Sequence, residues 1–402
     1  MKKILLLGGS HFQVPSVLKA VEMGYYTITC DYLPDNPGHK YAHEYHNVST
    51  TDKEKILELA ARLQVDGIVC YASDPSAPTA AYVASRLGLA SNPYESVEIL
   101  SNKDLFRDFL AKNGFNSPKS KGYTDVDEAA KDLFEFNFPV FVKPIDSSGS
   151  KGVSMLNSQD DFAKCVEYAL SFSRAQRFIV EECIPNNGYQ VGGDGFSVNG
   201  KLVFRCFNNQ HFDAKSINPF IPIGITYPCM KPAYIQEKIH NEIQRLFDLL
   251  GMRSGAYNFE VCVDKNENVH IMEIGARNGG NLVPQVTKYA TGVDMVEYTL
   301  RAAMGEDCSA LEMRETIGFW GNYKISSQYE GILENIFIDE EFKMNNLVEL
   351  SMYYNKGDEI PSFADTSGIL GILISKYDNI NEMIAKIENM AKYVKIHLKR
   401  EL

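Results

Sequence analysis

The sequence predicts an α/β fold in its N-terminal part and an α+β fold in the part that follows. In the first hundred residues, short apolar segments alternate with helical patterns, which is typical of a parallel sheet with right-handed crossovers. From about residue 117, apolar segments alternate with glycine-rich turns and helical patterns become rarer, which favours an α+β arrangement. A chain of 402 residues is expected to form two or three domains.

Three short apolar segments predict the strands of the parallel sheet. They cover residues 3–7, 26–32 and 67–71, and helical patterns lie between and after them at residues 15–23, 53–63, 93–101 and 103–113. Ligands of open parallel sheets usually bind at the carboxyl ends of the strands. Asp31 and Asp74 lie near two of these ends. We expect Asp74 to contact a substrate, and the alternative is that it caps the helix that follows Pro75.

The second part of the chain predicts strands, two helices and one hairpin. We expect strands at residues 138–144, 153–156 and 178–184, helices at 234–250 and 283–303, and a hairpin at 256–274. From about residue 307, further strands and one helix at 380–393 predict a small C-terminal subdomain. The expected domains are therefore residues 1–115, 116–306 and 307–402.

The hairpin is the most informative segment because it carries two glutamates. Apolar runs flank a polar turn at residues 264–268, which is a hairpin signal. If the turn centres on residues 266 and 267, Glu260 lies opposite Glu273. Two carboxylates opposed on a sheet repel each other, and Mg²⁺, which prefers oxygen ligands, would relieve that repulsion. The same register places Cys262 opposite Ile271 and Asp264 opposite Val269.

An alternative register, shifted by one residue, would turn one of these glutamates to solvent. The residues after Glu273 favour the metal interpretation. Arg277, Asn278 and two glycines form a turn rich in hydrogen-bond donors. An arginine beside two carboxylates suits an anionic phosphate or carboxylate group.

A lysine and a loop of small residues precede the hairpin. Residues 138–144 predict a strand that presents Lys143, and residues 147–152 are rich in serine and glycine. The backbone N–H groups of such a loop can bind phosphates. The loop has no Walker A pattern, and Gly8-Gly9-Ser10 does not complete a dinucleotide-binding fingerprint. Alone, the loop is better explained as a flexible hairpin, but the lysine and the paired acids together favour phosphate binding.

Composition limits the classes of partner. The net charge of −12 disfavours nucleic acid and anionic membrane surfaces as partners. The sequence contains no run of 18 apolar residues that would span a membrane. Eight scattered cysteines without C-x-x-C spacing suit a reducing compartment. We expect a cytoplasmic protein that acts on small molecules.

The order of these motifs resembles the ATP-grasp superfamily from residue 1 to about residue 305. Residues 1–115 resemble a pre-ATP-grasp domain. Residues 116–306 resemble the ATP-grasp fold, with ATP between the subdomains 116–185 and 186–306. The N-terminal half is most similar to carbamoyl-phosphate synthetase and to the phosphoribosylaminoimidazole carboxylase ATPase subunit, and amino-acid ligase-like proteins are similar too.

The resemblance implies a role for each matched residue. Glu260 and Glu273 match the magnesium ligands, and Arg277 matches the arginine that steadies the transferred phosphate or acyl phosphate. At the hinge strand, Glu182 and Ile184 match the backbone positions that pair with adenine, and the Glu181 side chain is a further candidate. The residues expected at the phosphates are Lys103, Lys143, Ser148, Gly149 and Ser150.

Two positions depart from the family pattern. Gln190 stands where the family has an acid that binds the ribose hydroxyls. Gly275 stands where the family has an asparagine that binds the metal, and Asn278 is the candidate substitute for that asparagine.

The resemblance implies a ligase that uses ATP with Mg²⁺ or Mn²⁺ to activate a carboxylate as an acyl phosphate and joins it to an amine or ammonia. The catalytic residues would be Arg277, Lys143 and Asn278. Two alternatives stay open: a carboxylase or kinase of the same fold that acts on bicarbonate or a small metabolite, and a non-catalytic ATP-binding regulator. The expected partners are a small-molecule carboxylate and an amine, and a homodimer is left open.

Overall fold

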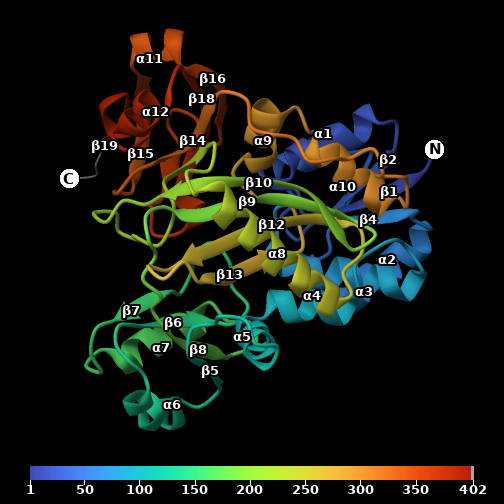
Figure 1. Cartoon of the computed structure of the whole chain (residues 1–402). Helices are drawn as coiled ribbons and strands as arrows, with labels where there is room; N and C mark the ends of the chain where they lie inside the picture. Colours follow the sequence, from blue (N-terminus) through green and yellow to red (C-terminus); the bar gives the residue numbers. More distant parts are fainter. Residues whose placement is uncertain (400–402) are drawn as a thin grey trace.

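The computed structural model describes residues 1–399, and in this part of the chain the strands form four sheets. Figure 1 shows the N-terminal sheet, a small sheet built from residues near 120–182, a large central sheet, and the C-terminal strands above it. One sheet is parallel and the others are antiparallel. This mixture confirms the predicted fold class.

The N-terminal sheet is parallel and has the strand order β3-β2-β1-β4. Its strands are β1 (Lys3–Leu7), β2 (Tyr26–Cys30), β3 (Glu44–His46) and β4 (Gly67–Cys70), and its helices are α1 (Val14–Glu22), α2 (Lys53–Leu63) and α3 (Ala77–Leu87). Buried aliphatic side chains of β1 and β2 pack against α2 and α3. The three predicted strands are present, although β2 ends at Cys30, and β3 is an additional strand that the sequence did not predict.

The small sheet is antiparallel and has the order β5-β8-β6-β7. Its strands are β5 (Ser120–Tyr123), β6 (Val140–Pro144), β7 (Ser154–Leu156) and β8 (Phe178–Glu182), with helices α6 (Val126–Asp132) and α7 (Phe162–Ser171). Helices α4 (Tyr94–Ser101) and α5 (Lys103–Lys112) connect it to the N-terminal sheet. The chain therefore reaches the small sheet through α5, which begins at Lys103.

The central sheet has eight strands within residues 1–399, in the order β13-β12-β9-β10-β11-β14-β18-β16. They are β9 (Gln190–Val198), β10 (Lys201–His211), β11 (Gly224–Tyr227), β12 (Gly255–Val263), β13 (Val269–Gly275), β14 (Phe319–Ser326), β16 (Leu347–Met352) and β18 (Ile369–Tyr377). Strand β14 pairs with β11, so the chain after residue 307 extends the same sheet. We keep a domain boundary at residue 306 as a proposal, although this sheet continues across it.

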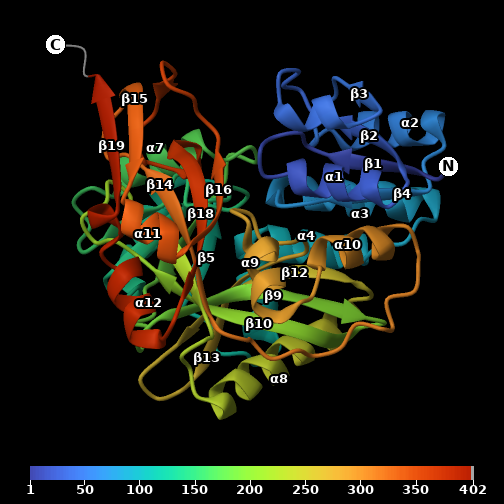
Figure 2. The ribbon, with the colours of Figure 1, turned by 90° about the horizontal axis from the view of Figure 1, so that it is seen from above.

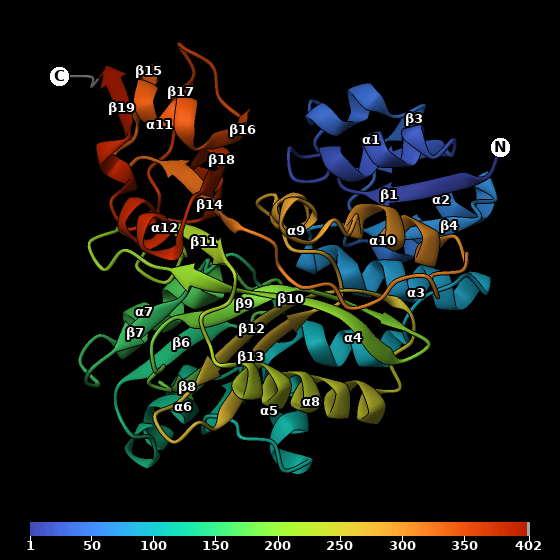
Figure 3. The same ribbon diagram turned by 45° about the horizontal axis from the view of Figure 1, so that its top comes forward.

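Helices cover both faces of the central sheet. Figure 3 shows α8 (Ala233–Leu250) on one face, and α9 (Val283–Thr291) and α10 (Met295–Ala303) on the other. The apolar side of α8 packs on one set of buried strand residues, and α9 packs on a second set that includes Phe196 and Phe204. The central sheet therefore has an apolar core on each face.

The remaining elements lie mostly near the C-terminus. Strands β15 (Gly331–Ile338), β17 (Glu359–Ile360) and β19 (Val394–Lys399) form a sheet of their own, with α11 (Glu340–Asn345) and α12 (Ile380–Ile387) nearby. Figure 2 shows this group beside the central strands and away from the N-terminal sheet. Single 3₁₀ turns occur at Pro37–Tyr41, Asp74–Ser76, Leu133–Glu135, Thr366–Gly368 and Met390–Lys392.

Two predicted helices differ from the structure in length. The single helix expected at residues 283–303 is wrong, because α9 ends at Thr291. Its cap is Gly292, which is left-handed with φ 78°, and the Asp294 side chain caps the start of α10. The helix expected at 380–393 ends at Ile387. None of the helices in residues 1–399 has both the length and the apolar character needed to cross a lipid bilayer.

Candidate active site

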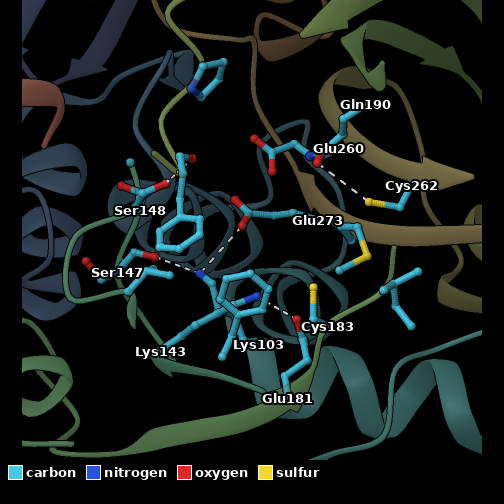
Figure 4. A pocket seen from close by; sticks show the side chains of 18 of the residues that line it. Lys103, Lys143, Ser147, Ser148, Glu181, Cys183, Gln190, Glu260, Cys262 and Glu273 are labelled. Carbon is cyan, nitrogen blue, oxygen red and sulfur yellow. Dashed lines mark hydrogen bonds and ion pairs between the residues drawn. The ribbon is translucent and has the colours of Figure 1, made fainter. Parts of the chain in front are cut away.

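A cavity of about 340 Å³ lies between the small sheet and the central sheet. Figure 4 shows side chains from both sheets that point into it. Most of the residues predicted from the sequence to bind nucleotide or metal line this cavity: Lys103, Lys143, Ser148, Gly149, Ser150, Glu181, Glu182, Ile184, Gln190, Glu260 and Glu273. The fold therefore brings together residues that are up to 170 positions apart in the sequence.

Glu260 and Glu273 are paired across β12 and β13, as predicted. The rest of the predicted register is wrong, because Cys262 lies opposite His270 and Val263 lies opposite Val269. A β-bulge between these pairs and the glutamates changes the register by one residue. The predicted glutamate pair is correct only because this bulge lies between the pair and the turn.

The two carboxylates have the chemistry of a divalent cation site. Burial, and then the charge of Glu273, raise the pKa of Glu260 to about 7, so a proton or a cation is favoured there. Mg²⁺ typically binds one or two carboxylates together with substrate phosphates. No cluster of three or more His, Cys, Asp or Glu side chains in residues 1–399 could hold a metal ion. A cation bound here would therefore complete its coordination with oxygens of a bound phosphate group or water.

Two lysines face these carboxylates across the cavity (Figure 4). The Lys103 Nζ donates to the Ser147 carbonyl oxygen at 2.8 Å and lies 3.6 Å from the Glu273 Oε2. The Lys143 Nζ donates to the Glu181 Oε1 at 2.6 Å. Both ammonium groups are thus held at the cavity wall, where an incoming phosphate chain could exchange with their present partners.

Glu181 belongs to a buried ion-pair network that also contains Arg107 of α5. Only 1% of the Glu181 side chain is exposed, and its Oε2 accepts from the Arg107 Nε at 2.5 Å. Burial alone would raise the pKa of Glu181, but the charges of Arg107 and Lys143 outweigh it and hold the pKa at about 2. The structure therefore places the Glu181 carboxylate between two cations.

Arg107 also supports the β-bulge beside the glutamate pair. Its guanidinium donates to the carbonyl oxygen of Ile271 at 3.3 Å and to that of Met272 at 2.9 Å. Sequence reasoning missed this residue. The sequence does contain a clue to its role. Arg107 lies beside Phe106 and about one turn before Leu110, on the buried side of α5. A cation without a partner would be costly there.

The serine- and glycine-rich loop has a backbone that needs glycine. Gly149 and Gly152 have φ values of 66° and 72°, and Ser150 has 57°. A Cβ on Gly149 would lie 2.7 Å from the Thr366 Oγ1, so the space is also closed to a side chain. The Ser150 hydroxyl donates to the Phe220 carbonyl oxygen at 3.0 Å. The loop therefore contacts the central and C-terminal segments across the cavity.

Arg277 lies close to the glutamate pair and is bound to Asp74, in the 3₁₀ turn that follows β4. The Arg277 Nε donates to the Asp74 Oδ1 at 2.7 Å, and a second guanidinium nitrogen donates to the Oδ2. Ser76, not Asp74, occupies the cap position of α3, so the capping alternative for Asp74 does not hold. A Cβ at Gly275 would lie 2.8 Å from the Asp74 Oδ1, so the ion pair fills the space that an asparagine at 275 would need.

Asn278 is not brought into either wall of the cavity. It is fully buried, and its Oδ1 accepts from the Thr299 hydroxyl at 2.9 Å. The neighbouring turn is instead held by Asp194, whose carboxylate accepts from the Gly279 N–H at 3.0 Å and from the Asn258 amide at 2.8 Å. Burial raises the pKa of Asp194 to about 6. The sequence reasoning did not identify Asp194.

Comparisons with known proteins agree with this geometry. A family model described as an ATP-grasp domain matches residues 136–285. The C-terminal section of the carbamoyl phosphate synthase large chain from Aquifex aeolicus is 21% identical over 398 residues, which cover 92% of this chain and 70% of that protein.

Two solved structures share the fold over nearly the whole chain. The L-amino acid ligase from Bacillus licheniformis has a TM-score of 0.81 at 19% identity and covers 100% of this chain and 99% of that one. The biotin carboxylase domain of 2-oxoglutarate carboxylase from Hydrogenobacter thermophilus, solved with MgADP and bicarbonate, has a TM-score of 0.76 at 17% identity and covers 99% and 91%. The family match thus identifies an ATP-grasp domain at residues 136–285, and the chain as a whole shares the fold of these solved structures.

Proposed function

We propose that this protein is an ATP-dependent ligase that activates a carboxylate as an acyl phosphate and joins it to an amine or ammonia, releasing ADP and phosphate. The observation that carries the proposal is the Glu260–Glu273 pair, which faces Lys103 and Lys143 across one cavity. Paired acids opposite paired cations suit a metal-bound phosphate chain.

The cavity residues have separate tasks in this proposal. Lys103, Lys143 and the backbone of the loop 147–152 bind the phosphates of ATP. Glu182 and Ile184 pair with adenine through their backbone, and Gln190 contacts the ribose. Glu260 and Glu273 would hold Mg²⁺, which would neutralise charge on the phosphoryl group that is transferred.

The reaction needs positioning and charge stabilisation more than covalent chemistry from the protein. A carboxylate oxygen of the substrate attacks the γ-phosphorus, and the bond to the β-phosphate oxygen breaks. The amine nitrogen then attacks the acyl carbon, the carbon–oxygen bond to phosphate breaks, and the amine proton leaves with the phosphate. The loop 147–152 excludes water, because an acyl phosphate hydrolyses readily.

Arg277 would stabilise the negative charge that develops on the acyl oxygen. Asp74 holds the guanidinium in a fixed orientation at the edge of the cavity, which keeps its remaining donors aimed in one direction.

The test is the variant Glu273→Gln. We expect the rate of ADP release to fall at least about 100-fold, and calorimetry should show that Mg²⁺ no longer strengthens ATP binding, while the melting temperature stays close to that of the wild type. The control is Glu267→Gln, in the exposed turn of the same hairpin. Near-normal turnover in Glu273→Gln would contradict the proposal.

The same assay separates the alternatives. ADP release with amino or other organic acids plus an amine supports the ligase, whereas ADP release that requires bicarbonate supports a carboxylase. ATP binding without ADP release in the presence of any acceptor supports a non-catalytic regulator.

We also propose a cytoplasmic location, because the eight cysteines are free thiols that suit a reducing compartment. A homodimer is a further proposal that size-exclusion chromatography would test.

A further inference from the structure

A second cavity, of about 220 Å³, adjoins the first. The two cavities share Glu260, Glu273 and the loop residues Ser148, Gly149 and Ser150. The second cavity extends away from the hinge strand toward β10, β14 and the turn after Arg277. It therefore lies at the end of the nucleotide cavity where the terminal phosphate would be placed.

The wall of this cavity carries hydrogen-bond acceptors that have no donor. Within residues 1–399, Asn208, Gln210, Asn281 and Asn322 line the cavity, and each has a buried side-chain oxygen without a hydrogen-bond partner. An unsatisfied buried polar group costs about 1–3 kcal/mol. Four acceptors around one space favour a ligand that supplies N–H or O–H groups.

Two of these amides form hydrogen bonds with their neighbours. The Asn322 Nδ2 donates at 2.6 Å to the carbonyl oxygen of Asn281, an atom that can only accept, so the assignment of the amide nitrogen and oxygen of Asn322 is fixed. The Asn208 Nδ2 donates to the Tyr227 hydroxyl at 3.1 Å. Both asparagines are only 1% exposed, and the oxygen of Asn322 is therefore a fixed acceptor.

The same wall carries a cation that, among the residues that the structure describes, has no carboxylate in direct contact. Lys324 of β14 is 5% exposed and lines the cavity, and its Nζ donates to the Pro222 carbonyl oxygen. Burial lowers the pKa of Lys324 to about 8, and the negative charge of Glu260 opposes this shift in part. Arg277, the other cation on this wall, is already bound to Asp74. Lys324 is thus a cation on this wall that is not held by a carboxylate in the described part of the chain, whereas Arg277 is.

We propose that the second cavity binds the carboxylate substrate, and that this substrate is a small acid with amino or hydroxyl groups close to its carboxylate. Lys324 pairs with the carboxylate, and the oxygens of Asn208, Gln210, Asn281 and Asn322 accept from the amino or hydroxyl groups. The cavity is smaller than the roughly 300–1,000 Å³ of sites for drug-sized ligands, which favours an acid with few carbon atoms. The inference rests on the proposed ligase function and adds the substrate class to it.

The first experiment compares matched acids. Alanine, lactate and propionate have the same three-carbon skeleton and differ in an amino group, a hydroxyl group or neither, and serine and glycerate extend the set. A site with buried polar partners rejects an analogue that lacks the matching group strongly. We expect calorimetry and ATP-dependent ADP release to favour an amino or hydroxy acid over propionate by at least about 100-fold. A preference for alanine and serine would show that the site binds an amino group, and a preference for lactate and glycerate would show that it binds a hydroxyl group.

Equal use of propionate, or binding of none of these acids, would overturn the inference. This failure is distinct from failure of the proposed function, because a ligase with a different substrate would still bind Mg-ATP and would release ADP with another acid.

The second experiment tests Lys324 with the variant Lys324→Met. We expect KM for the preferred acid to rise at least about 10-fold with unchanged Mg-ATP affinity, and the melting temperature to stay the same or rise, because a buried unpaired charge is removed. A purely structural lysine predicts the opposite: a lower melting temperature and an unchanged KM. The control is Lys395→Met, an exposed lysine on β19, which should change neither quantity.

Discussion

Replacing Glu181 with glutamine should lower the free energy of unfolding by about 3 kcal/mol at pH 7. The pKa of Glu181 in the folded protein is about 2, against 4.5 ordinarily, and each pKa unit corresponds to about 1.4 kcal/mol. This value agrees with the loss of about 3–5 kcal/mol that follows removal of one partner from a buried ion pair in other proteins. Glutamine keeps the shape of the side chain but removes the negative charge between Arg107 and Lys143.

The pH dependence of this effect has a defined sign. The folded-state pKa of Glu181 is lower than its unfolded value, so its contribution is fully present above about pH 4.5 and is lost as the pH falls toward 2. The difference in stability between wild type and variant should therefore be constant from pH 7 to pH 5 and shrink at lower pH.

Urea denaturation followed by circular dichroism measures these differences. The control is Glu182→Gln, because the neighbouring Glu182 accepts hydrogen bonds from Asn137 near the surface and should change stability by less than about 0.5 kcal/mol. If Glu181→Gln were as stable as the control at pH 7, the charge network would not stabilise the fold as we argue.

Three further changes test individual contacts. Gly275→Asn should lower stability by about 1–3 kcal/mol, because its Cβ would lie 2.8 Å from the Asp74 Oδ1; an unchanged melting temperature would show that this ion pair can move. Gln190→Glu should lower KM for ATP about fivefold in steady-state kinetics, since hydrogen bonds to a charged acceptor are about twice as strong, and an unchanged KM would count against a ribose contact. Asp194→Ala should cost about 1–3 kcal/mol in chemical denaturation, because the Gly279 N–H and the Asn258 amide lose their acceptor; a loss below 0.5 kcal/mol would show that other groups replace it.

The parallel sheet and its helices could be predicted because their signals are local. Short apolar segments predicted β1, β2 and β4, and helical patterns predicted α1 and α2. The break between α9 and α10 was missed, although Gly292 and Asp294 are a common C-terminal and N-terminal helix signal. The apolar pattern continues across this break, so the two helices were predicted as one.

The glutamate pair shows which strand pairings can be predicted from the position of a turn. Turn geometry predicts the pairs next to the turn, and those pairs were off by one residue. The bulge that restores the glutamate pairing depends on carbonyl groups held by Arg107, which is more than 160 positions away in the sequence. Contacts at such a separation leave no local pattern, so neither the bulge nor its support could be predicted.

The polar wall of the second cavity was invisible for the same reason. Lys324 lies in a strand that reads as mostly apolar and aromatic, and the amide side chains that surround its cavity come from β10, β14 and the turn after Arg277. Only the folded sheet shows that they converge, and that several of their oxygens have no donor.

The pairing of β14 with β11 bears on how such proteins diversify. Asn322 and Lys324 reach the cavity from outside residues 136–285, whereas Lys143, the loop 147–152 and the paired glutamates lie within that segment. Substitutions in β14 could therefore change which acid is bound, while the residues that bind the phosphates stay the same. Related proteins that differ mainly at positions 322 and 324 should then differ in the acid that they bind and share the same phosphoryl-transfer reaction.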